Sequence, residues 1–153
     1  MSELVCRTLE LLAESKGAFV SAVKNIFNTR TMAALCLPLK KEWYEMIESG
    51  IKIEEYRDLS EYWISRLTRY GDDGKLNGKL YANFLSTSPN VLKLNIEGGI
   101  MRFAEFESVK FSYGYTKRTM NFECKGVSIG RGRKEWGAPN NDVFIIKLGK
   151  RID

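Results

Sequence analysis

Lys52, Glu55 and Arg57 place an amine, a carboxylate and a guanidinium within one short stretch of the chain. The two cations can bind phosphate oxygens, and a carboxylate beside them can accept a proton. In a regular strand, side chains alternate between faces, so Lys52 and Glu55 would diverge. They converge if Lys52 lies in a turn before the strand, for which Gly50 is suited, or if a bulge redirects it. The alternative is an amphipathic strand with a solvated Glu55–Arg57 ion pair, and the motif alone leaves both open.

Further sequence blocks lie before and after this motif. A helical segment precedes Gly50, Lys52, Glu55 and Arg57, and later blocks lie at 109–115, 126–130, 135–138 and 144–149. The motif resembles the Gly-x-Lys-x-x-Glu-x-Arg signature of ASCH domains, a branch of the PUA-like small β-barrels. The block at 109–115 is similar to that family's Phe-x-x-Gly-Tyr strand, and the others to its closing strands. The resemblance covers residues 33–70 and 106–152.

This resemblance implies an α+β fold, a PUA-like small mixed β-barrel with flanking helices, over residues 32–153. Residues 1–31 lie outside it and are predicted to be an N-terminal helical appendage, because apolar residues between 2 and 28 recur at helical spacing. The appendage could pack on its own barrel, act as a dimerisation arm, or bind a protein partner. The three roles stay open at the level of sequence.

The resemblance also implies that a cleft lined by Lys52, Glu55 and Arg57 binds RNA or a nucleotide. Some ASCH proteins cleave RNA. Here that reaction would use Lys52 to stabilise charge, Glu55 as base and Arg57 to hold the phosphorane oxygens, which makes these three the candidate catalytic residues. Others remove the acyl group from acetylated cytidine with a Thr three residues after the Lys, and Glu55 stands at that place here, so their covalent route is in doubt. A protein-interaction module using residues 1–31 is the third hypothesis.

Composition narrows the chemistry further. The 153 residues suit one domain, and 44% hydrophobic with 28% charged residues is typical of globular proteins. The absence of histidine excludes Ser-His-Asp, Cys-His and histidine-ligated zinc chemistry within one chain. Three widely spaced cysteines predict reduced, buried thiols, and we predict no cofactor and no metal site. No apolar stretch is long enough for a membrane and the N-terminus does not look like a secretory leader, so we expect no membrane contact and a cytoplasmic location.

Positive charge is concentrated towards the C-terminus. Residues 109–153 contain ten Lys and Arg against four Asp and Glu, a balance that favours polyanions such as RNA. Arg131, Arg133 and Trp136 lie in a Gly-rich loop suited to gripping a phosphate and stacking a base. A tight hairpin with Trp136 capping the barrel is the alternative. Tyr56 and Tyr113 are the tyrosines that we expect beside the pocket for base stacking.

The elements that must position these residues follow from periodicity and from helix-breaking residues. Residues 33–39 predict a strand, 40–49 a helix ended by Gly50, and Ser60 the cap of a second helix. Lys40 is assigned to a solvated helix face, and Trp43 and Trp63 mainly to the core. Residues 80–85 and 91–96 alternate like strands, which predicts a hairpin inserted at about 70–105. Further strands are predicted at 106–113, 118–129 and 142–149.

Overall fold

The structure is a computed structural model that describes residues 32–70 and 78–153. The chain divides into two compact units between Arg30 and Thr31, and the described residues belong to the second unit. The helix predicted over residues 2–28 and the roles considered for residues 1–31 lie outside the described residues. The unit described below is the one that was expected to carry the site.

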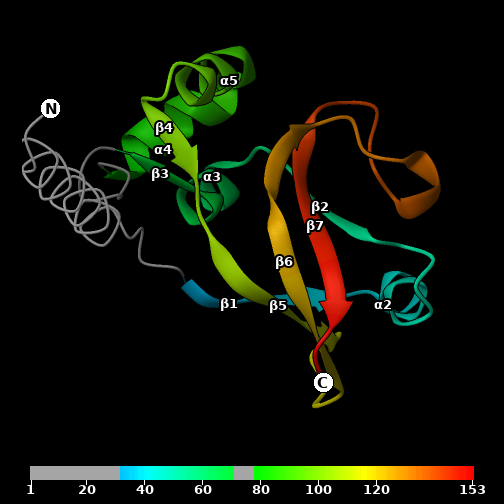
Figure 1. The fold of residues 1–153 in the computed structure, drawn as a ribbon. Coiled ribbons are helices and arrows are strands. Elements are labelled where there is room, and N and C mark those ends of the chain that lie inside the picture. The colour runs from blue at the N-terminus through cyan, green and yellow to red at the C-terminus, as the bar shows by residue number, and fades with distance from the viewer. Residues whose placement is uncertain (1–31, 71–77) are drawn as a thin grey trace, which may run out of the picture. The chain divides into compact units, whose positions relative to one another are not determined.

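A curled five-stranded sheet forms the centre of this unit (Figure 1). In spatial order its strands are β1 (Met32–Leu39), β5 (Phe106–Tyr113), β6 (Thr119–Gly130), β7 (Val143–Arg151) and β2 (Glu54–Arg57). β1 pairs in parallel with β5, and the other neighbours are antiparallel. The first two strands of the chain are therefore the two edges of a half-barrel. This confirms the predicted α+β composition and a small, barrel-like sheet.

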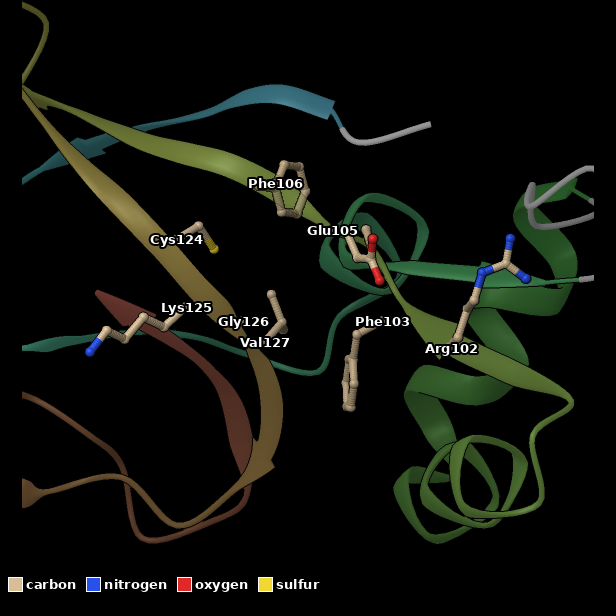
Figure 2. A pocket seen from close by; sticks show the side chains of 9 residues that line it. Arg102, Phe103, Glu105, Phe106, Cys124, Lys125, Gly126 and Val127 are labelled. Atoms are coloured by element: carbon tan, nitrogen blue, oxygen red, sulfur yellow. The ribbon is translucent and has the colours of Figure 1, made fainter. Parts of the chain in front are cut away.

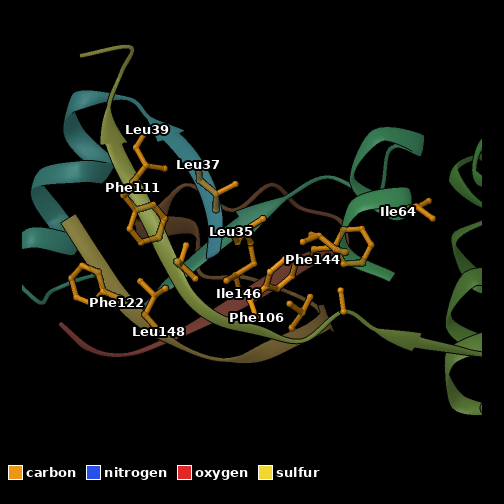
Figure 3. Close-up of a cluster of buried hydrophobic side chains, with 14 of the residues drawn as sticks. Leu35, Leu37, Leu39, Ile64, Phe106, Phe111, Phe122, Phe144, Ile146 and Leu148 are labelled. Atoms are coloured by element: carbon orange, nitrogen blue, oxygen red, sulfur yellow. The ribbon is translucent and has the colours of Figure 1, made fainter. Parts of the chain in front are cut away.

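Alternating apolar side chains explain how the sheet encloses its core. In β1, Leu35, Leu37 and Leu39 are buried, whereas the residues between them face outward. Figure 3 shows these leucines gathered with aromatic and aliphatic side chains of the other strands inside the curl of the sheet. Burial of each such side chain stabilises the fold by about 1.5–3 kcal/mol. The inward side chains of β1 therefore hold this edge strand to the core in addition to its backbone pairing.

β7 is buried on both faces, as its continuous apolar run indicates. Phe144 and Ile146 face the main core. Val143 and Ile145 face the other way and form a second, smaller cluster with Trp136. Tyr56 of β2 belongs to the same cluster. The loop that follows β6 is therefore fastened over β7 and β2, next to the Lys52 motif.

Helices accompany the sheet at two places in the described residues. α2 (Lys41–Glu48) packs against β5. α3 (Glu61–Leu67), α4 (Gly78–Thr87) and α5 (Pro89–Glu97) gather beside a small second sheet of β3 (Thr68–Tyr70) and β4 (Met101–Phe103) (Figure 1). None of the helices in the described ranges combines the length and apolar character needed to span a membrane.

The hairpin predicted within residues 70–105 is wrong. Residues 80–85 lie in α4 and residues 91–96 in α5. Leu85 is fully buried while Leu80 is 85% exposed, a division between two faces of a helix. Apolar runs this short do not distinguish a period of two from one of 3.6, and the proline in the first turn of α5 is a helix-start signal.

The other predicted elements are confirmed within a few residues. The strands expected at 106–113, 118–129 and 142–149 correspond to β5, β6 and β7, and the first strand and helix correspond to β1 and α2. Within the loop after β6, Lys134–Trp136 form a turn of 3₁₀-helix. The expectation of buried thiols is wrong for Cys36, which is exposed on the outward face of β1, and Cys124 is only half-buried.

Candidate functional site

Lys52 lies in the turn between α2 and β2, before the strand begins at Glu54. The turn is built by Gly50, whose φ of +78° is a left-handed conformation that favours glycine. The Lys52 backbone N–H then donates to the Met46 carbonyl at 3.0 Å, which ties the turn to the last part of α2. This is the arrangement in which the sequence allowed Lys52 and Glu55 to converge.

The three charged side chains of the motif meet around one carboxylate. Lys52 Nζ lies 2.6 Å from Glu55 Oε2, and Arg57 Nη1 donates to the other oxygen, Oε1. Glu55 and Arg57 are two residues apart in β2 and so share a face. Only 3% of Lys52 and 3% of Glu55 is exposed. The alternative of a solvated surface ion pair is therefore wrong.

Aromatic rings surround these charges. Lys52 Nζ lies 4.9 Å from the ring centroid of Trp43 and 5.3 Å from that of Tyr56. Arg57 Cζ lies 5.1 Å from the ring of Trp63. Both cations are thus within the range in which an aromatic face attracts positive charge. The rings stabilise the two cations on the sides that Glu55 does not reach.

A pocket of about 380 Å³ opens beside this cluster. It lies where the end of β1 approaches β2, and the Arg57 Nη2 donates to the Pro38 carbonyl of β1 at 3.5 Å. The volume falls in the range of small-molecule sites. The lining residues come from both edge strands, from α2 and α3, and from the loop after β6: Pro38, Leu39, Lys40, Trp43, Lys52, Glu55, Tyr56, Arg57, Trp63, Trp136 and Gly137.

Tyr56 is the predicted stacking residue that does line the pocket. Its hydroxyl donates to Glu54 Oε2 at 2.9 Å and accepts from the Arg133 backbone N–H at 3.1 Å. Burial, together with the neighbouring Glu54 carboxylate, raises the pKa of Tyr56 to about 12, against the opposing effect of the Arg133 N–H. The hydroxyl therefore stays protonated in the neutral range and acts as a clamp between β2 and the loop.

The loop predicted to grip phosphate contributes Trp136 to the pocket, but not its two arginines. Trp136 is 7% exposed, so it both packs in the smaller cluster and lines the pocket. The guanidinium carbon of Arg133 lies 4.4 Å from the Trp136 ring centroid. Arg131 Nε pairs with Asp142 Oδ1 at 3.2 Å. Neither arginine lines the pocket. Both are exposed to solvent, and both lie a few residues before the lining residue Trp136 in the sequence.

Tyr113 is also absent from the pocket lining. Its ring packs edge-on against Tyr44 of α2, with centroids 5.3 Å apart. The Arg118 guanidinium lies over both rings and pairs with Glu48 at 2.7 Å. The structure therefore gives Tyr113 a packing role between α2 and β5.

Lys40, Trp43 and Trp63 line the pocket although the sequence favoured other roles for them. Lys40 ends up there because it stands at the junction of β1 and α2, not on the outer face of the helix. Trp43 and Trp63 are only partly buried, which separates them from core residues such as Ile64. Their helical spacing does not separate a pocket-lining ring from a core ring, and their contacts with Lys52 and Arg57 appear only in the structure.

A second, larger hollow of about 530 Å³ lies between β6 and the junction of β4 with β5 (Figure 2). Its lining combines the apolar side chains of Phe103, Phe106 and Val127 and the Cys124 thiol with three charged residues, Arg102, Glu105 and Lys125. Its larger volume does not make it the better site, because it lacks the buried Lys52–Glu55–Arg57 cluster and the tryptophan rings that line the smaller pocket. The smaller pocket combines buried charge with aromatic walls and is the stronger candidate.

No family model, curated protein or solved structure matches this chain. The chemistry of the pocket is therefore argued from its own geometry. Within residues 32–70 and 78–153, no three His, Cys, Asp or Glu side chains gather as a metal site would require. The pocket provides cations, flat aromatic surfaces and one carboxylate that accepts a hydrogen bond on each of its oxygens.

Proposed function

We propose that the pocket beside Lys52 binds single-stranded RNA or a nucleotide. The observation that carries this proposal is the buried Lys52–Glu55–Arg57 cluster, walled by aromatic rings in a pocket of nucleotide size. Cations attract the phosphate, and an aromatic face can stack a base with about 1–3 kcal/mol. The excess of Lys and Arg in residues 109–153 supports a polyanionic ligand.

Charge in the pocket favours an anion over a cation. Lys40, Lys52 and Arg57 line it against the carboxylate of Glu55. The rings of Trp43, Tyr56 and Trp63 already lie next to the protein's own cations. A cationic ligand would compete with those side chains, whereas a phosphate would add to their neutralisation.

Binding, rather than hydrolysis, is the function that the geometry supports best. Both oxygens of Glu55 already accept hydrogen bonds from Lys52 and Arg57, so the carboxylate serves the protein's own cations rather than standing ready for a substrate. The ribonuclease and deacylase hypotheses are therefore less well supported than the binding hypothesis. We also propose that the fold is of the ASCH type, which the half-barrel and the convergence of Lys52, Glu55 and Arg57 support.

Lys40 and the adjacent Lys41 provide a matched test of the binding site. Lys40 lines the pocket, whereas Lys41 points to solvent and pairs with Glu45 on α2. We expect Lys40→Ala to weaken binding of a labelled single-stranded RNA and to lower the slope of log affinity against log salt by about 0.7. Lys41→Ala should leave both unchanged. Fluorescence anisotropy over a salt series measures both quantities.

Equal affinities and slopes in the two variants would remove the pocket from RNA binding. The same RNA, and acetylated cytidine, should be recovered intact after incubation with the protein. Turnover of either substrate that is lost in Arg57→Lys, a variant that keeps the charge, would replace binding by hydrolysis as the function.

A further inference from the structure

The loop after β6 contacts the two aromatic rings that flank the Lys52 ammonium. These rings belong to Trp43 and Tyr56, whose centroids lie 4.9 and 5.3 Å from Lys52 Nζ. Trp43 is on α2 and Tyr56 is on β2, so neither ring is fixed to the other by secondary structure. Whatever holds both rings also determines where the ammonium sits.

Gly132 lies directly against the Tyr56 ring. A Cβ atom at Gly132 would be 2.8 Å from Tyr56 Cε1 and 2.5 Å from Ala138 Cβ, closer than real Cβ contacts. The adjacent Arg133 N–H donates to the Tyr56 hydroxyl at 3.1 Å. The loop therefore contacts the Tyr56 ring and also donates a hydrogen bond to its hydroxyl. Any side chain at position 132 must displace the Tyr56 ring or Ala138.

Gly137 stands in the same relation to Trp43. A Cβ atom there would be 2.6 Å from Trp43 Cζ2. The φ of Gly137 is +86°, which glycine adopts without strain. Because Trp136 lies in the apolar cluster next to it, the loop has little freedom to move away. The Trp43 ring would have to shift instead, along with its contact to Lys52.

We propose that Gly132 and Gly137 are positioning residues that hold the Lys52 ammonium at Glu55 by fixing the Tyr56 and Trp43 rings. The loop after β6, which the sequence suggested as a phosphate-binding loop, would in this role support the Lys52 ammonium. The consequence for ligand binding rests on the proposed function, since it requires Lys52 to contact the ligand. The positioning itself does not.

The reactivity of the Lys52 amine tests the positioning without any RNA. The full-length protein is acetylated briefly with acetic anhydride under native conditions, and peptide mass spectrometry gives the ratio of Lys52 to Lys41 labelling. Lys41 serves as the exposed internal reference. In Gly132→Ala and Gly137→Ala we expect this ratio to rise about tenfold, because protection of a buried group depends on local opening.

Two other glycines supply matched controls. Gly99 has a φ of +76°, and no atom lies within 4 Å of the place that a Cβ atom would take there, so Gly99→Ala imposes the backbone strain of Gly137→Ala without its collision. Gly130, at the end of β6, would make only an ordinary 3.6 Å contact with Ile145, so Gly130→Ala matches Gly132→Ala. Both controls should keep the wild-type labelling ratio, and thermal unfolding identifies variants that are not folded.

A third variant keeps the test decisive if either glycine variant does not fold. Tyr56→Phe retains the ring but loses the hydroxyl that accepts from Arg133 and donates to Glu54, and its Lys52 labelling should rise about threefold, less than in the glycine variants, because the ring itself is not displaced. An unchanged Lys52 ratio in the folded variants, or an equal rise in the controls, overturns the proposal. Anisotropy with labelled RNA on the same proteins is scored separately: a wild-type protein that binds no RNA overturns the proposed function, while the labelling still decides the positioning.

Discussion

At the scale of single residues, the site depends on a buried carboxylate shared by two cations. Glu55 accepts from Lys52 on one oxygen and from Arg57 on the other, with Lys52 and Glu55 almost completely buried. Such a cluster contributes little net stability compared with an apolar core, because desolvation of the charges offsets their attraction. Under the proposed function, the role of this cluster is to present its cations to a ligand. Removing one partner, however, leaves buried charge uncompensated.

Glu55→Gln should therefore lower the free energy of unfolding by about 3–5 kcal/mol, because it leaves the Lys52 ammonium buried without a counter-charge. The control is the neighbouring Glu54→Gln, which removes a partly buried charge but leaves an amide oxygen for the Tyr56 hydroxyl. That change should cost about 1 kcal/mol or less. Urea denaturation of both variants gives the comparison. Similar losses in the two would mean that the Glu55 cluster is not energetically special.

At the scale of elements, sequence patterns predicted the long strands and the helices on either side of the Lys52 motif, and missed α4 and α5. β5, β6 and β7 were found because each spans eight or more residues, with apolar side chains recurring along the strand. α4 and α5 were missed because their apolar runs are short and the faces that pack are chosen by tertiary contacts with α3 and β4. The Lys52–Glu55 convergence was anticipated as one of two geometries. The lining by Lys40 and Trp63 was not, because it arises only when the two edge strands approach each other.

The burial of α4 supplies a prediction that separates a helix from the hairpin that its sequence favoured. Leu85→Ala should lower the free energy of unfolding by about 2–5 kcal/mol, since Leu85 is fully buried. Leu80→Ala should change it by less than about 0.5 kcal/mol, since Leu80 is exposed and lies on the opposite face. Urea or thermal denaturation of both variants checks this. A larger loss from Leu80→Ala would contradict the helical burial pattern.

At the scale of the whole molecule, positive charge extends well beyond the pocket. Arg131, Arg133 and Lys125 are exposed on the loop and on β6, outside the residues that line the site. Composition alone predicted this excess, because charge counts do not depend on how the chain folds. Which of these positive charges line the pocket and which lie outside it is known only from the structure. Under the proposed function, an oligonucleotide that extends past the pocket has these exposed cations available for its phosphates, whereas a mononucleotide contacts only the residues that line the pocket.

An RNA oligonucleotide should therefore show a steeper dependence of affinity on salt than a mononucleotide. Each additional phosphate that is neutralised on a single strand adds about 0.7 to the magnitude of the slope of log affinity against log salt. Anisotropy or calorimetric titrations between low and physiological salt measure both slopes. Identical slopes for the two ligands would show that the cations outside the pocket do not contact the RNA backbone.

The way the half-barrel closes has a consequence for what it can admit. No strand pairing joins β1 to β2 in the described residues, and at the pocket the Arg57 side chain reaches from one edge to the Pro38 carbonyl of the other. A ligand that binds the Arg57 guanidinium in place of Pro38 would break this contact between the edges. The backbone hydrogen bonds between paired strands would stay intact. Under the proposed function, a nucleoside too wide for the resting pocket would separate the two edges by displacing Arg57, whose hydrogen bonds to Glu55 and to the Tyr56 carbonyl would also have to yield, while the strand pairing of the sheet remains.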